Sequence, residues 1–237
     1  MDLILFADPG GEQSHTYEYL EIMERWLLER GMPPITRVWY TTKDGERLTL
    51  EQECLRSGSL ALHLLRPQKC SLKTQGDAPG KVLQPPPGCR DAWAKGEKVV
   101  KLIGYDAGEE RRRVKALPHD LQDPKYRKEY PLMDWGWDRG DCVQAIQSAG
   151  LPLPGKSSCF FCPSMKPREI RTLYHQYPEL LERALAIEDN ARPNLRTVRG
   201  LGRDFAWRDF ILADEAQLTL PEAFSADDLP CSCSVSG

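Results

Sequence analysis

Two cysteines carry the clearest chemical signal in the sequence. Cys159 and Cys162 stand in a short segment bounded by Gly155 and Pro163, so two thiols lie about one turn apart and face the same way. A metal lowers the pKa of such thiols and binds both as thiolates. A redox-active dithiol is the alternative for this spacing. We predict a metal centre here, either a 4Fe-4S cluster or a zinc ion.

A cluster or a structural zinc takes four protein ligands, so two more are expected. We predict Cys70 and Cys142 in these positions. Cys231 and Cys233, in an acidic and serine-rich tail, are the alternative pair. Cys142 also shares a helical face with apolar residues, and a plain core cysteine is an equal alternative there.

Composition limits the class of protein. The chain has 237 residues, 41% hydrophobic and 28% charged, with a net charge of −3, which suits one main core. This charge gives no broad positive field for duplex DNA or an anionic membrane. No apolar run is long enough for a membrane span, and the first ten residues do not resemble an export signal. We expect a soluble cytoplasmic protein, whose cysteines are reduced and free to bind metal.

Strands and helices alternate along the predicted elements. Segments 3–7, 35–41 and 98–105 have the apolar or β-branched composition of strands. Apolar spacing, capping residues and Gly or Pro stops predict helices around 19–27, 49–58, 139–149, 167–176 and 178–191. Residues 74–89 are rich in Gly and Pro and are expected to form a long loop.

This alternation predicts an α/β fold with a mostly parallel sheet and flanking helices, in which ligands lie at the carboxyl ends of the strands. We expect residues 1–165 to form an α/β domain that contains the cysteine site. Residues 166–237 would form a helical extension and an acidic tail packed on the same domain.

Basic and aromatic residues have two interpretations each. Arg111, Arg112 and Arg113 either hold a phosphate or sulfate or form a solvated face. Lys156 and Lys166 flank the cysteine pair, where they either attract an anion or are simply exposed. For Trp135 and Trp137 we favour packing in the core over lining a pocket.

Several separated segments together resemble the phosphoadenosine phosphosulfate reductase family, within the adenine nucleotide alpha-hydrolase or PP-loop ATP pyrophosphatase superfamily. Their order and spacing match across most of the chain. The segments are 7–12 with 16–17, 69–73, 103–106 with 111–112, 130–132 with Trp135, 150–152 and 159–163. The most similar subgroup is that of bacterial and phage-encoded reductase-like proteins.

The resemblance implies a pocket for a nucleotide-like anionic substrate, with ATP or another adenine nucleotide as a candidate ligand. It also implies an electron donor or sulfur donor protein as a partner, and sulfonucleotide reduction or sulfur transfer as the activity. A nucleic-acid substrate fits the resemblance, although the charge does not indicate one. The implied pocket residues are Asp8, Gly10, Gly104, Asp106, Arg111 and Arg112.

One departure from the family concerns its phosphate loop, a Ser-Gly-Gly-x-Asp-Ser segment that binds the pyrophosphate of ATP. Residues 9–14 lack the first serine and the aspartate, and the carboxylate of Glu12 would repel phosphate. Two interpretations therefore stand: an enzyme of this family, or a non-catalytic module held together by its metal, either alone or as one subunit beside a partner chain.

Overall fold

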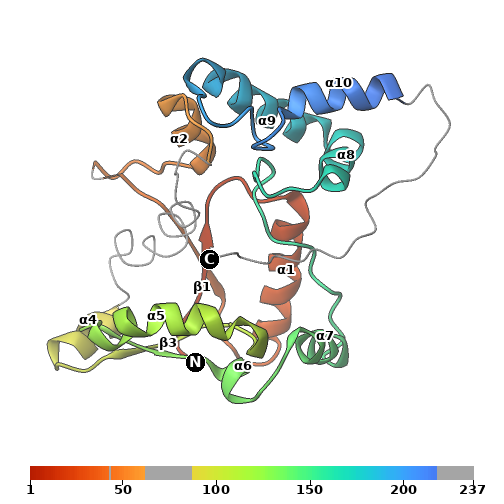
Figure 1. The fold of residues 1–237 in the computed structure, drawn as a ribbon. Coiled ribbons are helices and arrows are strands. Elements are labelled where there is room, and N and C mark those ends of the chain that lie inside the picture. Colours follow the sequence, from red (N-terminus) through yellow and green to blue (C-terminus); the bar gives the residue numbers. More distant parts are fainter. Residues whose placement is uncertain (43, 62–86, 218–237) are drawn as a thin grey trace.

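The computed structural model describes residues 1–42, 44–61 and 87–217. These form a mixed α/β structure in which helices flank two small sheets (Figure 1). Strand β1 (Ile4–Asp8) pairs in parallel with β2 (Ile35–Trp39), and β3 (Val99–Leu102) pairs in parallel with β4 (Tyr126–Glu129). The α/β class is as predicted. The described residues form two separate two-stranded sheets rather than one sheet.

The first sheet is a β-α-β unit. The apolar run that forms β1 ends at Asp8, and α1 (Ser14–Leu28) crosses over to β2, as a parallel connection requires. Gly31 follows the helix with a φ of +67°, a conformation that glycine adopts without strain. The stop predicted at Gly31 is therefore confirmed.

Helix α2 (Leu50–Ser57) follows its local sequence signals closely. The side chain of Thr49 accepts a hydrogen bond from the Gln52 amide, and the Gln52 side chain accepts one from the Thr49 amide, which completes the predicted capping box. Gly58 ends the helix in the left-handed conformation. Asn194 Nδ2 donates to the Gly58 carbonyl over 2.9 Å and so holds α2 against the C-terminal helices.

The second sheet belongs to a strongly charged region. It includes α4 (Pro87–Ala94), the short helix η2 (Ala107–Glu109), α5 (Glu110–Gln122), α6 (Pro131–Asp134) and α7 (Arg139–Ser148), which Asp138 caps as predicted. Two expectations were wrong here. A loop was predicted for 74–89, but α4 begins at Pro87, because proline suits the first turn of a helix. Residues 74–86 of the predicted loop lie outside the described residues. Trp135 is 62% exposed rather than buried, and it packs on Trp137 instead.

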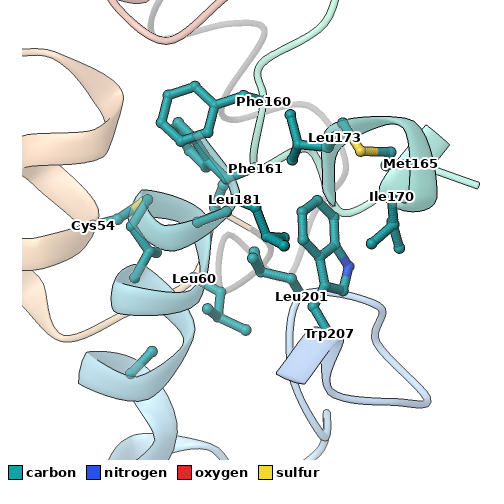
Figure 2. Packing of buried hydrophobic residues seen from close by; sticks show 14 of the residues in the cluster. Cys54, Leu60, Phe160, Phe161, Met165, Ile170, Leu173, Leu181, Leu201 and Trp207 are labelled. Carbon is teal, nitrogen blue, oxygen red and sulfur yellow. The ribbon is translucent and has the colours of Figure 1, made fainter. Parts of the chain in front are cut away.

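The main hydrophobic core lies among the helices of the C-terminal part and α2 (Figures 1 and 2). Helices α8 (Pro167–Gln176) and α9 (Pro178–Ala191) have the predicted bounds, and η3 (Arg192–Asn194) and α10 (Trp207–Gln217) follow them. The core draws on both sides of residue 165, since Phe160 and Phe161 pack with Leu181 and Leu60. Within the described residues, no helix is long and apolar enough to cross a membrane.

Candidate functional site

The predicted cysteine pair lies against the loop that follows β1. The amide of Phe160 donates to the Gly11 carbonyl over 2.8 Å, and the amide of Gln13 donates to the Ser158 carbonyl over 3.2 Å. Cys159 thereby pairs with Glu12 as a short antiparallel bridge. The cysteine segment is thus fixed at the carboxyl end of a parallel strand, the edge at which open α/β sheets bind their ligands.

The two cysteines share one tight turn. The amide of Cys162 donates to the Cys159 carbonyl over 3.0 Å, and both side chains are half-buried. Between them, Phe160 and Phe161 are 1% and 0% exposed and pack edge to face in the core. A Cβ on Gly11 would lie 2.8 Å from the Phe161 ring, so glycine permits the close approach of the two segments. The phenylalanines anchor the turn in the core, and the two cysteines remain only half-buried.

Asp8 organises the loop after β1. Its buried carboxylate accepts hydrogen bonds from the Gly10 amide over 2.7 Å and from the Tyr17 hydroxyl over 2.9 Å. Arg47 lies 3.7 Å from the second carboxylate oxygen and stacks on the Trp39 ring. Burial and the neighbouring Asp8 carboxylate raise the pKa of Tyr17 well above its usual range, so its hydroxyl remains a donor.

Glu12 points into the protein. It is 5% exposed, and its carboxyl group accepts a hydrogen bond from Ser157 Oγ over 3.0 Å. Burial raises the pKa of Glu12, and the Ser157 hydrogen bond partly opposes this effect. Glu12, which stands where the family that the sequence resembles has its phosphate loop, is therefore hydrogen-bonded to the cysteine segment.

The remaining predicted pocket residues lie at the carboxyl end of β3, in the second sheet. Asp106 caps η2 by accepting from the Gly108 amide over 2.8 Å. Arg112 pairs with Glu109 and stacks on the Tyr105 ring at 4.5 Å. Gly104 directly precedes Tyr105 in the chain, and the Arg111 side chain is exposed.

The predicted nucleotide pocket therefore has two parts in the structure. Asp8 ends β1 and Gly10 lies in the loop after it, whereas Gly104, Asp106, Arg111 and Arg112 follow β3. Among the described residues, no hydrogen bond or ion pair connects the two parts.

The predicted metal ligands are also divided. Cys142 lies on α7, where burial and then the charge of Asp106 are the main causes of a raised thiol pKa. In the described part of the chain, no three His, Cys, Asp or Glu side chains gather as metal ligands, so Cys142 does not complete such a set with Cys159 and Cys162. The other predicted ligands, Cys70, Cys231 and Cys233, lie outside the described residues.

The sequence motifs give no indication of Arg47 as a partner of this site, whereas Ser157 and Tyr130 lie in or beside segments that the motifs indicate. Arg47 reaches Asp8 through a turn after β2 in which Thr41 pairs with Arg47, a contact without a local signal. Ser157 is adjacent to the cysteine motif, and the motif itself indicated that segment. Tyr130 lies beside Tyr105 at the end of β4, with ring centroids 5.6 Å apart.

No family model, curated protein or solved structure matches the chain. The geometry of these residues and the resemblance of the sequence motifs are therefore the basis for assigning a function.

Proposed function

We propose that the protein is a phosphoadenosine phosphosulfate reductase-like iron-sulfur protein that reduces, or transfers sulfur on, a nucleotide or nucleic-acid substrate. The observation that carries this proposal is the docking of the Cys159–Cys162 turn on the loop after β1. This contact brings two half-buried thiols to the carboxyl end of a parallel strand. An adenine nucleotide alpha-hydrolase-like fold with one mostly parallel sheet is part of the proposal.

The two thiols fit half of a four-ligand metal site. They lie on one turn, held by the hydrogen bond between the Cys162 amide and the Cys159 carbonyl. Cys70 would add a third thiolate, and Cys142 or one of the tail cysteines a fourth. A 4Fe-4S cluster held by these residues would provide a redox-active group beside the substrate, whereas zinc would only hold the turn.

Other residues would prepare the substrate pocket. Asp8, held by Tyr17 and Arg47, keeps the loop after β1 in a fixed conformation beside the cysteines. Arg112 stacks on Tyr105 and offers part of its guanidinium to an anion. The Arg112 guanidinium would bind a nucleotide phosphate or sulfate, with ATP or another adenine nucleotide as the candidate ligand.

The proposed reduction consumes two electrons and converts the sulfate group of a sulfonucleotide into sulfite and a free nucleotide. A dithiol electron donor protein would supply the electrons and leave as a disulfide. The test is sulfite release from phosphoadenosine phosphosulfate by anaerobically purified protein with a dithiol donor. We expect release by the wild type and by Cys89→Ser, and loss in Cys159→Ala. Release that is equal in all three proteins would contradict the proposal.

A second candidate is a non-catalytic module stapled by zinc or a cluster, as one subunit beside a partner chain. The observation that favours it is the deep burial of Phe160 and Phe161, which makes the cysteine turn part of the core (Figure 2). In this case Cys159→Ala would lower stability and metal content, and the wild type would release no sulfite.

A further inference from the structure

A turn from the C-terminal part of the chain lies beside the cysteine segment. Arg203 is at its tip and has a φ of +64°, the only positive value among the described residues other than glycine. A side chain in this left-handed region is uncommon, and such strain concentrates at functional positions. The Arg203 guanidinium approaches Ser164 Oγ at 3.5 Å, two residues after Cys162.

A buried carboxylate stabilises this turn through hydrogen bonds to its backbone. Glu188 on α9 is fully buried and accepts hydrogen bonds from the amides of Leu201 and Trp207, each over 2.8 Å, and from that of Arg208 over 3.1 Å. Gly200 packs directly on this carboxylate, where a Cβ would collide with it. Glu188 also occupies the amides at the start of α10, which are therefore not free for a ligand.

Two backbone hydrogen bonds within residues 199–203 close the turn. The Arg199 amide donates to the Arg203 carbonyl over 2.7 Å, and the Arg203 amide donates to the Gly200 carbonyl over 3.1 Å. The surrounding structure thus determines the left-handed conformation of Arg203. This conformation places the exposed cationic side chain within reach of Ser164, in the segment that follows Cys162.

The charge of Arg203 is uncompensated in the described structure. Arg203 is exposed and has no carboxylate within ion-pair distance among the residues described. Lys156, which also flanks the cysteines, pairs with Glu169 over 3.1 Å, and Arg183, which stacks on Phe160, pairs with Glu51. Among the described residues, Arg203 therefore presents a cation without a carboxylate partner beside Ser164, two residues after Cys162.

We propose that Arg203 is an anion-binding residue of the cysteine site, which binds the phosphate or sulfonate group of the substrate beside Cys162. The guanidinium suits this role because its planar fork donates two parallel hydrogen bonds to such an anion. The inference rests on the proposed function for the identity of the substrate.

The test measures binding of AMP by calorimetry at low ionic strength, where charge interactions are least screened. Arg203→Gly and Arg203→Asn both tolerate the left-handed backbone, so they remove the charge without a conformational cost. We expect each to weaken AMP binding about tenfold and to leave the thermal unfolding midpoint unchanged or raised. The matched control is Arg127→Gln, which removes the same charge from β4, where Arg127 pairs with Glu129.

Each outcome is decisive. Weaker binding in both Arg203 variants, with full binding in Arg127→Gln, supports the inference. Unchanged binding in the Arg203 variants, no binding by the wild type, or a lower unfolding midpoint without a change in binding overturns it. Sulfite release and metal content test the proposed function separately. An Arg203-dependent anion site in a protein that releases no sulfite would support this inference and contradict the proposed activity.

Discussion

The strongest single prediction concerns Glu188. Its carboxylate accepts three backbone hydrogen bonds at a position with no exposed surface. Glu188→Ala leaves three amides without an acceptor, and each such loss costs about 1 to 3 kcal/mol. We take the lower end, because the Arg208 amide is only partly buried. The expected loss in the free energy of unfolding is therefore about 3 kcal/mol, a large share of the stability of a typical domain.

A graded series tests the mechanism behind this loss. Glu188→Gln keeps one oxygen, which can still accept from Leu201 and Trp207, but its amide group opposes the Arg208 amide. We expect an intermediate loss of about 1 to 2 kcal/mol. The control Glu182→Ala, at an exposed position on the same helix, should change stability by less than about 0.5 kcal/mol.

Urea unfolding followed by tryptophan fluorescence measures these differences, and amide hydrogen exchange at Trp207 reports the turn directly. The reasoning is refuted if Glu188→Ala costs no more than Glu182→Ala, or if the amide of Trp207 exchanges as slowly in the variant as in the wild type.

Two further predictions concern packing and pH. Gly11→Ala should lower the free energy of unfolding by about 1 to 3 kcal/mol, because the added methyl group meets the Phe161 ring. The control Gly104→Ala places its methyl group in open space and should have little effect in urea unfolding. Equal effects of the two substitutions would contradict this reasoning. Burial is the main cause, and the charge of Lys128 the second cause, of a lowered pKa of Lys101. Below this lowered pKa the charged Lys101 reduces the free energy of unfolding, and the reduction disappears as pH rises towards 10.5. Lys101→Met should therefore raise the melting temperature at pH 7 but much less near pH 10, while a change that is equal at both pH values would argue against the cause.

Local signals predicted those elements whose ends depend on neighbouring residues. The capping box at Thr49, the cap at Asp138, and the bounds of α8 and α9 are all confirmed. Helix α10 was not predicted, because Trp207 begins it where the distant Glu188 satisfies its first amides. That contact spans 19 residues and has no local signature.

The candidate site likewise contains residues that local spacing identified and residues that only tertiary contacts bring to it. Spacing alone identified Cys159 and Cys162, and the structure places their turn beside the loop that contains Asp8 and Gly10. Spacing did not identify Arg47 or Arg203, because each reaches the site from a distant turn through tertiary folding. The third and fourth metal ligands stay predictions for the same reason, since ligand sets assemble from distant parts of the chain.

The most direct test of the central claim is the iron, zinc and acid-labile sulfide content of anaerobically purified protein. We expect about four irons and four sulfides per chain in the wild type and in Cys89→Ser, with absorbance near about 400 nm, and the loss of both in Cys159→Ala and Cys162→Ala. One zinc without sulfide would contradict the cluster and favour the structural module. No metal, or a metal content unaffected by either substitution, would contradict a metal centre at the cysteine pair.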